Sequence, residues 1–463
     1  MLQLPLINII NIVQANSIIN QNPLIKNVTN DITKLGNDTV VFHLNKDVEM
    51  NMKEVIKYKN LFIITDQPVL NDESIESDKF IYVLDINKAY FRFINYYRSL
   101  FNIPVVAITG TCGKTTTKEI IRQILENEFK VASTISNKNN LGFNHDYLLS
   151  INNETSCGVF ETALSYPGNL ITGCDFFKPT IGIITNIGID HLNGCKTINN
   201  YIRAKGEMLA GLQYKGTLII NNDDENIKKI NLSAFKGKIV TFGINNPSDI
   251  FARNIDYKDD GMEFHINFKD VNYQVYMPGL GIHNVYNAIA AISALIVLGF
   301  DINKIVKYIR NIKHIRSHVE FHKGYNNSTI IDDTWSSNPT SFKAAMEVLT
   351  KKGEGKVKIV ILGKINYLGD YAQSQYEEIG KIIVDNKVDF VITTDSYSKQ
   401  IGISAISNGL MPDYHIHCKD NKELKHTLEC LLDKNTIALF KTSMLEQSIT
   451  GIIKEFIVED INQ

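Results

Sequence analysis

A segment rich in glycine and threonine has the residue types that bind phosphate. From position 109 to 116 it reads T-G-T-C-G-K-T-T. Glycines let the backbone turn tightly and point N–H groups at phosphate oxygens, and Lys114 would neutralise the outer phosphates. The hydroxyl of Thr115 is suited to Mg²⁺. The segment predicts ATP or GTP binding, and the alternative is a turn that only caps a helix. The residues predicted to bind nucleotide here are Thr109, Gly110, Thr111, Gly113, Lys114, Thr115 and Thr116.

The neighbouring sequence predicts a strand before this segment and a helix after it. Residues 104–108 are apolar, which is typical of a buried strand, and an amphipathic helix is expected from 117 to about 129. A strict Walker motif would have glycine at Ile108, so the segment fits the narrower pattern T-G-T-x-G-K-T. Alternating strands and helices predict a largely parallel sheet. The further elements expected are strands at 180–185 and 216–220 and helices at 199–212 and 284–298.

The length of the chain predicts several domains. At ~150 residues per domain, 463 residues correspond to about three. Residues 249–277 alternate in polarity, which predicts antiparallel strands attached to the central sheet. From about residue 315 the strand–helix alternation restarts with four strands, as in a doubly wound domain. We therefore expect an α/β protein with a small α/β N-terminal domain at 1–100, a central P-loop-type domain with a mostly parallel sheet at 101–313 and a Rossmann-like C-terminal domain at 314–463.

Composition excludes several classes of function. The chain has 48 basic and 50 acidic residues, so it lacks the basic surface of a general nucleic-acid binder. Its six cysteines form no C-x-x-C pair, which disfavours a zinc ribbon or a disulfide framework and favours free thiols in a reducing cytosol. No apolar run reaches the ~20 residues of a membrane span, and the N-terminus lacks the basic start of a signal peptide. We expect a cytoplasmic monomer that binds small molecules, without membrane insertion.

Six further segments follow the phosphate loop in a fixed order. They are S-N-K-N-N-L-G at 136–142, E-T-A-L-S-Y-P-G at 161–168, T-N-I-G-I-D-H-L at 185–192, A-K-G-E at 204–207, G-I-H-N-V-Y-N-A at 281–288 and D-D-T-W-S-S-N-P at 332–339. Together they are far more specific than the loop alone. Over them the chain resembles the Mur ligase family, from about Asn27 to the C-terminus. Within the family it is most similar to ligases that add D-alanyl-D-alanine to a UDP-muramoyl tripeptide.

The resemblance implies an ATP-dependent acid–amino-acid ligase of peptidoglycan (cell-wall) precursor synthesis that releases ADP. A carboxylate cannot be attacked by an amine until one of its oxygens becomes a good leaving group, and ATP provides this by forming an acyl phosphate. Catalysis of such a transfer is mainly positioning and electrostatic stabilisation. The implied reactants are therefore ATP, Mg²⁺, a small-molecule carboxylate and an amino acid or dipeptide. The resemblance assigns these substrates to the N-terminal, central and C-terminal domains as acid, ATP and amine.

The resemblance also implies which residues act. Lys114, Glu161, His191 and Lys205 match catalytic positions of the family. Thr115 and Glu161 fit one Mg²⁺, and His191 fits a second ion together with Lys205, whose counterpart is carbamylated in most of the family. Each residue has a plain alternative: Glu161 as a helix cap, His191 as a loop residue and Lys205 as a surface lysine. We expect Asp190, the neighbour of His191, to be solvated.

Other positions match residues that contact nucleotide or substrate. His283, Asn284 and Asn287 open an apolar helix beside the adenine, and N-capping is their alternative. Asp333 and Asn338 resemble residues that close over ATP, and Lys441 and Ser443 lie in a K-T-S segment resembling the K-G-S contact to the amine; for these the alternative is polar loop residues after a strand. The further positions are Asn139 for the nucleotide and Ser165, Arg203 and His318 for substrate, beside Lys441 and Ser443.

Three departures from the family pattern concern the substrate half. Residues 29–34 read T-N-D-I-T-K, where the family has an Asp-Ser-Arg signature for the UDP group. The Gly-Arg before the last domain is replaced, with His318 at the arginine position and Arg316 nearby. The run L-G-D-M-x-E-L-G becomes L-G-K-I-N-Y-L-G at 362–369, which replaces two acidic positions by Lys364 and Tyr367.

These departures keep other hypotheses open. A paralogue could join an amino acid to a carboxylate outside cell-wall synthesis. A nucleotide-binding module that has lost ligation is a hypothesis from another class. A P-loop NTPase switch would leave the other two domains without a role.

Overall fold

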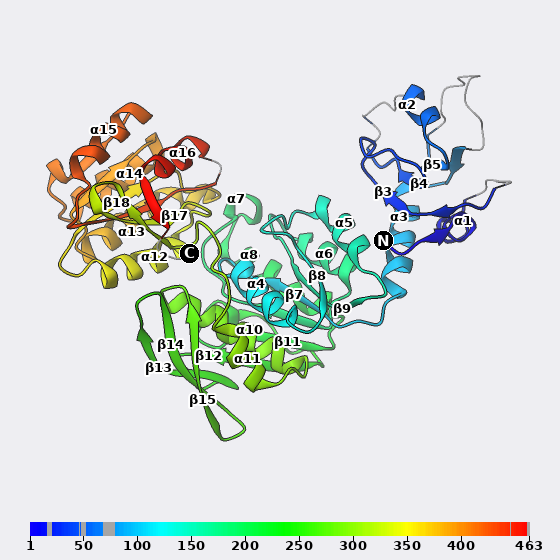
Figure 1. The fold of residues 1–463 in the computed structure, drawn as a ribbon, viewed down its shortest axis with the longest axis horizontal. Coiled ribbons are helices and arrows are strands. Elements are labelled where there is room, and N and C mark those ends of the chain that lie inside the picture. The colour runs from blue at the N-terminus through cyan, green and yellow to red at the C-terminus, as the bar shows by residue number, and fades with distance from the viewer. Residues whose placement is uncertain (16–20, 46, 48–51, 68–78, 445, 461–463) are drawn as a thin grey trace. The chain divides into compact units, whose positions relative to one another are not determined.

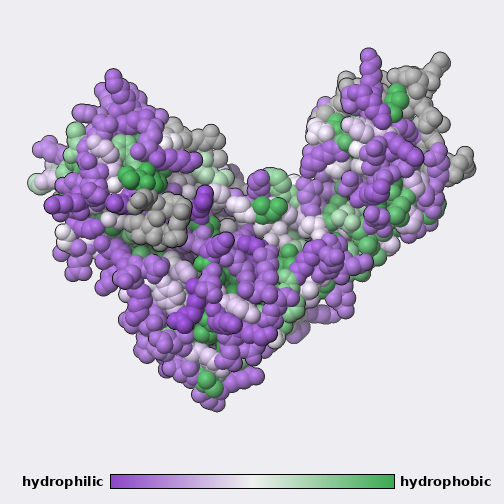
Figure 2. Space-filling model, in the orientation of Figure 1, coloured by the Kyte–Doolittle hydropathy of each residue, from purple (hydrophilic) through white to green (hydrophobic). Residues whose placement is uncertain are grey.

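The computed structural model describes residues 1–15, 21–45, 47, 52–67, 79–444 and 446–460. The chain divides into two compact units. The first comprises residues 1–107, 128–163 and 169–180, and the second comprises 108–127, 164–168 and 181–463. In the face drawn in Figure 2, hydrophilic residues predominate and hydrophobic ones occur in small groups. Among the described residues, no helix has the length and apolar character to cross a bilayer.

The first unit contains a parallel sheet of four strands in the order β3-β4-β5-β6. The strands are β3 (Asn27–Thr29), β4 (Thr39–Phe42), β5 (Leu61–Thr65) and β6 (Phe80–Tyr82). A separate antiparallel pair is formed by β1 (Leu4–Pro5) and β2 (Leu24–Ile25). The helices of this unit are α1 (Leu6–Val13), α2 (Met52–Lys57), α3 (Ile86–Ser99), α5 (Asn144–Ser150) and α6 (Asn169–Phe177). Short apolar runs at 40–42 and 61–64 form the two central strands of this sheet.

Helix α3 illustrates how the sequence builds this unit (Figure 1). Asp85 caps its start by accepting the N–H of Lys88 at 3.0 Å. Its apolar side chains recur at helical spacing and are buried, so one stripe of the helix enters the core. Phe93 and Tyr97 of this stripe share one cluster with Phe42 of the sheet. Arg98, also buried, donates to three main-chain carbonyls: Phe177 at 2.7 Å, Phe101 at 2.6 Å and Ile103 at 3.2 Å.

The largest sheet has nine strands in the order β15-β14-β13-β12-β11-β10-β7-β9-β8. The pairs from β10 to β13 are parallel, as is β8 with β9, whereas β13, β14 and β15 pair antiparallel, as the alternating sequence predicts. Figure 1 shows these last three strands as a long extension. The strands are β7 (Val105–Thr109), β8 (Lys130–Ser133), β9 (Thr155–Glu161), β10 (Ile181–Ile184), β11 (Thr217–Asn221), β12 (Lys238–Gly243), β13 (Ile250–Tyr257), β14 (Gly261–Phe268) and β15 (Val271–Pro278).

The helices of the second unit near this sheet differ in detail from the expected ones. The helix expected at 117–129 runs over Lys114–Leu125 (α4), because glycine at its N-cap lets it begin directly at the lysine. The helix expected at 199–212 is interrupted at Glu207 and becomes α8 (Ile198–Gly206) and α9 (Met208–Gly211). The helix expected at 284–298 is α10 (Ile282–Val297), which packs on α4. The others are α7 (Leu192–Cys195) and α11 (Ile302–Ile309).

The C-terminal part of the second unit contains a seven-stranded sheet in the order β20-β19-β18-β21-β17-β16-β22. The four predicted strands are present as parallel neighbours. The parallel strand β20 extends one edge, and the other edge is extended by β16, antiparallel to β17, and by β22, antiparallel to β16. The prediction of four strands was therefore incomplete. The strands are β16 (Glu320–Gly324), β17 (Thr329–Asp333), β18 (Val357–Leu362), β19 (Phe390–Thr393), β20 (His415–His417), β21 (Thr436–Lys441) and β22 (Ile457–Asp460).

Helices cover both faces of this sheet. Alternate strand residues such as Ile359 and Ile361 pack with apolar residues of α15 and α16 in one cluster. The other face carries the remaining helices, among which α12 contacts β21 and α14 contacts β19. The helices are α12 (Pro339–Lys352), α13 (Ala372–Asp385), α14 (Ser396–Ser407), α15 (Asn421–Leu431) and α16 (Gln447–Phe456). Short 3₁₀ helices lie at Leu141–Phe143, Ile227–Lys229, Tyr325–Asn327, Gly369–Tyr371 and Pro412–Tyr414.

The three hydrogen bonds that Arg98 donates to main-chain carbonyls should stabilise the first unit. We expect Arg98→Met to lower the free energy of unfolding by about 2–4 kcal/mol, because the buried carbonyls lose charged donors and gain none. Urea denaturation followed by circular dichroism measures this. The matched control is Arg92→Met on the same helix, where the side chain is exposed and the loss should stay within about 0.5 kcal/mol. Equal effects of the two changes would contradict this interpretation.

Candidate active site

The phosphate-loop segment connects β7 to α4, as the sequence predicts. Two of its residues have positive φ, 149° at Gly110 and 80° at Gly113, where glycine is favoured. A Cβ atom at Gly110 would lie 1.9 Å from Oγ1 of Thr185, and one at Gly113 would lie 2.1 Å from Oδ1 of Asn287. Because no side chain fits at either position, both glycines are required by the backbone conformation and by close packing.

Asn186 holds the loop in this shape. Its carbonyl accepts the N–H of Thr111 at 2.9 Å. Its side-chain Oδ1 accepts the N–H of Cys112 at 2.9 Å, and its Nδ2 donates to the carbonyl of Cys112 at 3.0 Å. The sequence analysis did not single out Asn186 as a site residue. Its position directly after the strand segment that neighbours the loop was the available signal, since ligands bind at the carboxyl ends of parallel strands.

Two lysines converge on the loop. Nζ of Lys114 donates to the carbonyls of Gly110 and Thr111, each at 3.0 Å. Nζ of Lys205, on α8, donates to the same Gly110 carbonyl at 3.0 Å and to Oγ1 of Thr109 at 3.1 Å. Lys205 is only 2% exposed, so the alternative of a surface lysine is wrong. Burial, and secondly the charge of Lys114, hold the pKa of Lys205 well below its usual range.

Tyr201 covers the second lysine. It lies one helical turn before Lys205 on α8, and its ring centre is 5.1 Å from the Lys205 Nζ. The Tyr201 hydroxyl is within hydrogen-bond distance, 3.2 Å, of the Thr111 hydroxyl. One buried tyrosine therefore joins the lysine to the phosphate loop. Thr115 and Thr116 follow in the first turn of α4, both partly buried.

His191 lies between β10 and α7 with a left-handed backbone, φ 52°. Burial lowers the pKa of its imidazole, so the ring is neutral at pH 7 and keeps a lone pair for a metal ion. Asp190 is 13% exposed and accepts the N–H of His191 at 2.8 Å, so the expectation that Asp190 is solvated was wrong. The carboxylate turns back onto the backbone, which the sequence did not indicate.

Two predicted residues lie in the first unit. Glu161 is the last residue of β9 and is 1% exposed, so the alternative of a helix cap is wrong. Oγ1 of Thr134 accepts the Glu161 N–H at 2.9 Å, and Asn139 Nδ2 donates to Glu161 Oε2 at 3.0 Å. A buried carboxylate at a strand end, with an amide fixing one oxygen, retains oxygen lone pairs of the type that Mg²⁺ prefers.

The start of α10 provides the predicted polar group. Its N-cap is Gly281, so the alternative that the polar residues cap the helix is wrong. Asn284 Nδ2 donates to the carbonyl of Leu280 at 3.0 Å, and Asn287 Nδ2 donates to Asn284 Oδ1 at 3.4 Å. Burial lowers the pKa of His283 to about 4, so this imidazole is neutral at pH 7.

The C-terminal residues Asp333 and Lys441 end neighbouring parallel strands, β17 and β21, and are directly paired in register. Both are buried, and Lys441 Nζ lies 2.7 Å from Asp333 Oδ2 and 2.5 Å from the carbonyl of Ser336. The alternative that they are loop residues is wrong.

Asn338 caps α12 by accepting the N–H of Ser341 at 2.9 Å, and its Oδ1 also accepts the thiol of Cys112 at 3.3 Å. This contact joins the phosphate loop to the start of α12.

The remaining substrate predictions occupy varied positions. Ser165 and Arg203 are exposed, and Ser443 is buried after β21. His318 is partly buried; its Nδ1 donates to the carbonyl of Arg316 at 2.8 Å, and its ring lies 5.4 Å from that of Trp335. Burial lowers the pKa of His318. The roles of these four residues toward substrate stay predictions.

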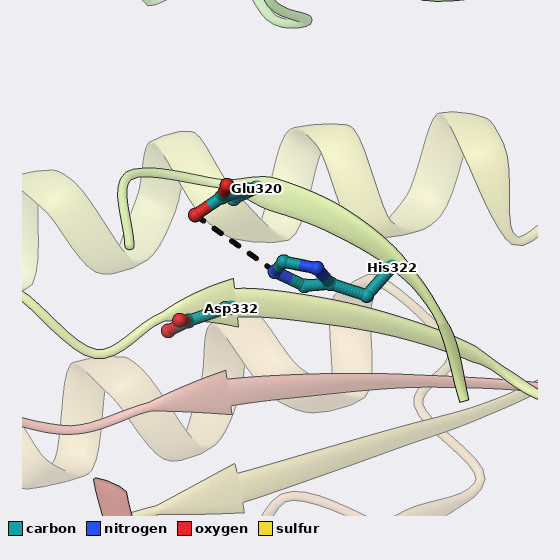
Figure 3. A group of neighbouring side chains, drawn as sticks. All are labelled: Glu320, His322 and Asp332. Atoms are coloured by element: carbon teal, nitrogen blue, oxygen red, sulfur yellow. Dashed lines mark ion pairs between the residues drawn. The ribbon is translucent and has the colours of Figure 1, made fainter. Parts of the chain in front are cut away.

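A separate titratable group lies in the C-terminal sheet (Figure 3). Glu320 and His322 are on β16 and Asp332 is on β17, with one ligand-type atom of each within 4.8 Å of the others. Hydrogen bonds already engage the acids: Ser317 donates to Glu320 at 2.8 Å and to Asp332 at 2.9 Å, and Thr334 donates to Asp332 at 2.6 Å. We interpret the group as fixing the loops around β16 and β17.

Comparison with known proteins finds related domains over most of the chain. Residues 108–295 match the Mur ligase middle domain, and residues 319–444 match the Mur ligase, glutamate ligase domain. The UDP-N-acetylmuramoyl-tripeptide–D-alanyl-D-alanine ligase of Bacillus subtilis is 29% identical over 398 residues, which cover 85% of this chain and 84% of that protein. The enzyme of the same name from Buchnera aphidicola is 28% identical over 366 residues, covering 79% of this chain and 78% of that protein.

Solved structures share the fold. The crystal structure of MurF from Acinetobacter baumannii has a TM-score of 0.84 at 23% identity and covers 97% of this chain and 99% of that one. MurF ligase from Thermotoga maritima, solved in complex with ADP, has a TM-score of 0.79 at 20% identity and covers 93% and 97%. The family models together span most of the chain, with the phosphate loop, Lys114 and Lys205 inside the first. The chain belongs to the Mur ligase family of ATP-dependent ligases.

Proposed function

We propose that this ligase joins D-alanyl-D-alanine, or a single amino acid, to the carboxylate of a UDP-muramoyl peptide. The observation that carries the ATP-dependent step is the convergence of Lys114 and Lys205 on the Gly110 carbonyl, at 3.0 Å each. The charged side chain of Lys114, together with the N–H groups at the start of α4, creates a site that an anionic phosphate chain would stabilise, and Lys205 lies directly beside it. The choice of substrates is supported by relatives of that name that match about four fifths of the chain.

The reaction begins with transfer of the terminal phosphoryl group. A carboxylate oxygen of the acid substrate forms a bond to the γ-phosphorus while the bond to the ADP oxygen breaks. Lys114 exchanges its two loop carbonyls for phosphate oxygens, and the N–H groups at the start of α4 stabilise the developing charge. The neutral amine then attacks the acyl carbon, inorganic phosphate leaves, and the amine loses one proton. Domain closure would exclude water from the acyl phosphate.

The chain offers donors of the type that Mg²⁺ prefers. Thr115 and Glu161 stay the residues that the family resemblance predicts for one ion, and His191 would hold a second with a carbamylated Lys205. Two observations support the fit: the imidazole of His191 is neutral because burial lowers its pKa, and the buried Lys205 amine has a lowered pKa. A neutral amine can take up CO₂, which would convert Lys205 into an oxygen ligand. When bound, Mg²⁺ would neutralise phosphate charge and polarise the transferred group.

We assign the substrates to three regions. Residues 1–100 would bind the head of the acid substrate, residues 101–313 would bind ATP, and residues 314–463 would bind the amine. His283, Asn284 and Asn287 would contact the nucleotide beside the loop, and Asn139 stays a further residue that the family resemblance predicts for the nucleotide. The cytoplasm, which supplies ATP, is the expected location.

A second candidate is a paralogue that uses a different carboxylate. One observation favours it: the charged side chains of residues 29–34 already have partners within the protein. Asp31 Oδ1 accepts hydrogen bonds from the N–H and the hydroxyl of Thr33, at 2.9 Å and 2.7 Å. The one cation of residues 29–34, Lys34, is paired with Asp146 at 3.0 Å. This stretch lacks the arginine of the family signature.

A substrate panel tests the proposed function. ADP release is measured with Mg-ATP, UDP-muramoyl peptides or other carboxylates, and D-alanyl-D-alanine or amino acids. We expect stimulation by the UDP-muramoyl tripeptide with D-alanyl-D-alanine, and Lys114→Ala should lower kcat/KM by about 100- to 1000-fold because a phosphate-binding charge is lost. Stimulation by other acids alone would favour the paralogue, and no stimulation by any pair would favour a silent binding module.

Removal of the Asn186 side chain should weaken nucleotide binding. Asn186→Ala deletes two hydrogen bonds to Cys112, so the loop is less well ordered and the KM for ATP should rise about tenfold. Steady-state kinetics under saturating acid and amine measure the change. Asn199→Ala, at an exposed position on α8, is the control and should leave the KM unchanged. An unaltered KM in Asn186→Ala would refute the role given to Asn186.

Carbamylation of Lys205 should be detectable by mass and by kinetics. We expect activity to fall when bicarbonate and CO₂ are removed and to return on their addition. Native mass spectrometry should show the mass of one CO₂ on the wild type and none on Lys205→Ala. Full activity without CO₂, with an unmodified Lys205, would show that the lysine acts as an amine.

A further inference from the structure

The loop that follows β18 in the C-terminal sheet contacts the segment of His191. The ring of Tyr367, in this loop, lies 5.1 Å from the His191 ring between centres, at an interplanar angle of 23°. The carbonyl of Tyr367 accepts the N–H of Leu192 at 2.9 Å. Gly369 lies close to the same helix start: a Cβ there would be 3.2 Å from the Asn193 nitrogen. The backbone of this loop therefore lies close to the start of α7 at two places beside the stacked pair of rings.

The backbone conformation of Tyr367 indicates that surrounding contacts hold this residue in place. Its φ is 63°, in the left-handed region, which costs a non-glycine residue free energy and persists where surrounding contacts impose it. The side chain is 46% exposed, so core packing does not explain the aromatic residue. The family pattern has an acidic residue at this position, whereas this chain has a ring that stacks on an imidazole.

His191 needs such a support. A histidine that binds a metal ion is commonly oriented by a carboxylate on its other nitrogen. The nearest candidate, Asp190, does not do this, because its Oδ2 is 3.9 Å from His191 Nε2, too far for a hydrogen bond. Asp190 instead accepts the backbone N–H. A flat ring parallel to the imidazole limits rotation of the side chain and leaves the edge nitrogens accessible.

The same loop also contacts the strand end that carries Lys441. The N–H of Gly363, at the beginning of the loop, donates to the Lys441 carbonyl at 3.2 Å. The loop thus extends from a residue assigned to the amine substrate to the residue assigned to the second ion. This loop therefore connects the C-terminal sheet both to the start of α7 and to the His191 ring.

The geometry points to Tyr367 as a positioning residue: its ring orients the His191 imidazole and links the docked C-terminal loop to the phosphoryl-transfer half of the site. This inference rests on the proposed function, in which His191 holds an ion that bridges phosphate and carboxylate. Tyr367 touches no reacting atom itself. It differs from the phosphate loop residues in that ATP binding does not require it.

Kinetics of two variants test the inference. Tyr367→Ala should lower kcat about three- to tenfold, the effect expected of one aromatic pair, and raise the Mg²⁺ concentration for half-maximal rate. The KM for ATP should change less than twofold. Tyr367→Phe keeps the ring and should retain wild-type values. Tyr325→Ala, which removes another exposed tyrosine (39%) and its ring contact with Phe456 from the same sheet domain, is the matched control and should leave kcat unchanged.

Three results would overturn the inference. They are an unchanged kcat in Tyr367→Ala, a Phe variant as impaired as the Ala variant, or a loss of activity matched by a lower Tm. A second measurement is independent of turnover: the ¹³C-labelled His191 ring signals, assigned with His191→Gln, should lose a ring-current shift in Tyr367→Ala and keep it in Tyr367→Phe. Absence of that shift in wild type would refute the stacking even if every substrate pair failed, whereas such failure with the shift present would refute only the proposed function.

Discussion

The carbonyl of Gly110 is the centre on which the site depends. It accepts hydrogen bonds from two lysines, at 3.0 Å each, within a loop that leaves no room for a side chain at Gly110 or Gly113. Two ammonium groups that share one acceptor repel each other, and this repulsion contributes to the low pKa of the buried Lys205. The arrangement is relieved when an anion arrives or when one lysine becomes neutral. Phosphate binding would meet the first condition, and the proposed carbamylation of Lys205 would also end the repulsion, because it replaces the positive charge by a negative one.

The fold places this centre at a junction of elements. The loop leaves the carboxyl end of β7, Asn186 follows the neighbouring β10, and the side chain of Asn287 reaches Gly113 from α10. The C-terminal part reaches the same place twice: Asn338 contacts the thiol of Cys112, and Tyr367 contacts His191. A ligase must hold a charged nucleotide and exclude water at the moment of transfer, and a place where strand ends meet the C-terminal sheet domain would suit both demands.

Local features of the fold were predictable from the sequence, and contacts between distant segments were not. The strand, glycine turn and helix from 105 to 125 follow from apolar pattern and residue type, and the antiparallel β13–β15 follow from alternation. The helix boundaries shifted because capping by Gly113 and the break at Glu207 depend on backbone geometry that pattern alone does not reveal.

The sequence indicated candidate site residues where residue type limits the chemistry. The structure brings the predicted phosphate loop and Lys205 together, and their roles stay predictions. The partial burial of Asp190, the hydrogen bonds of Asn186 to the loop and the stacking of Tyr367 on His191 were not predicted, because they depend on the folded backbone and on contacts between separate segments. Asn186 lay inside a recognised motif, so its polar side chain after a buried strand was a usable signal. Tyr367 was noted only as a departure, since its partner is far away in the sequence.

The central claim is that ATP activates the acid substrate as an acyl phosphate. Oxygen-18 in the substrate carboxylate tests this most directly, because the oxygen that attacks the γ-phosphorus leaves with the phosphate when the amide forms. With labelled UDP-muramoyl tripeptide, D-alanyl-D-alanine and Mg-ATP, the account predicts one labelled oxygen in the inorganic phosphate released per amide formed. Amide formation with unlabelled phosphate, or with the label in AMP, would contradict it.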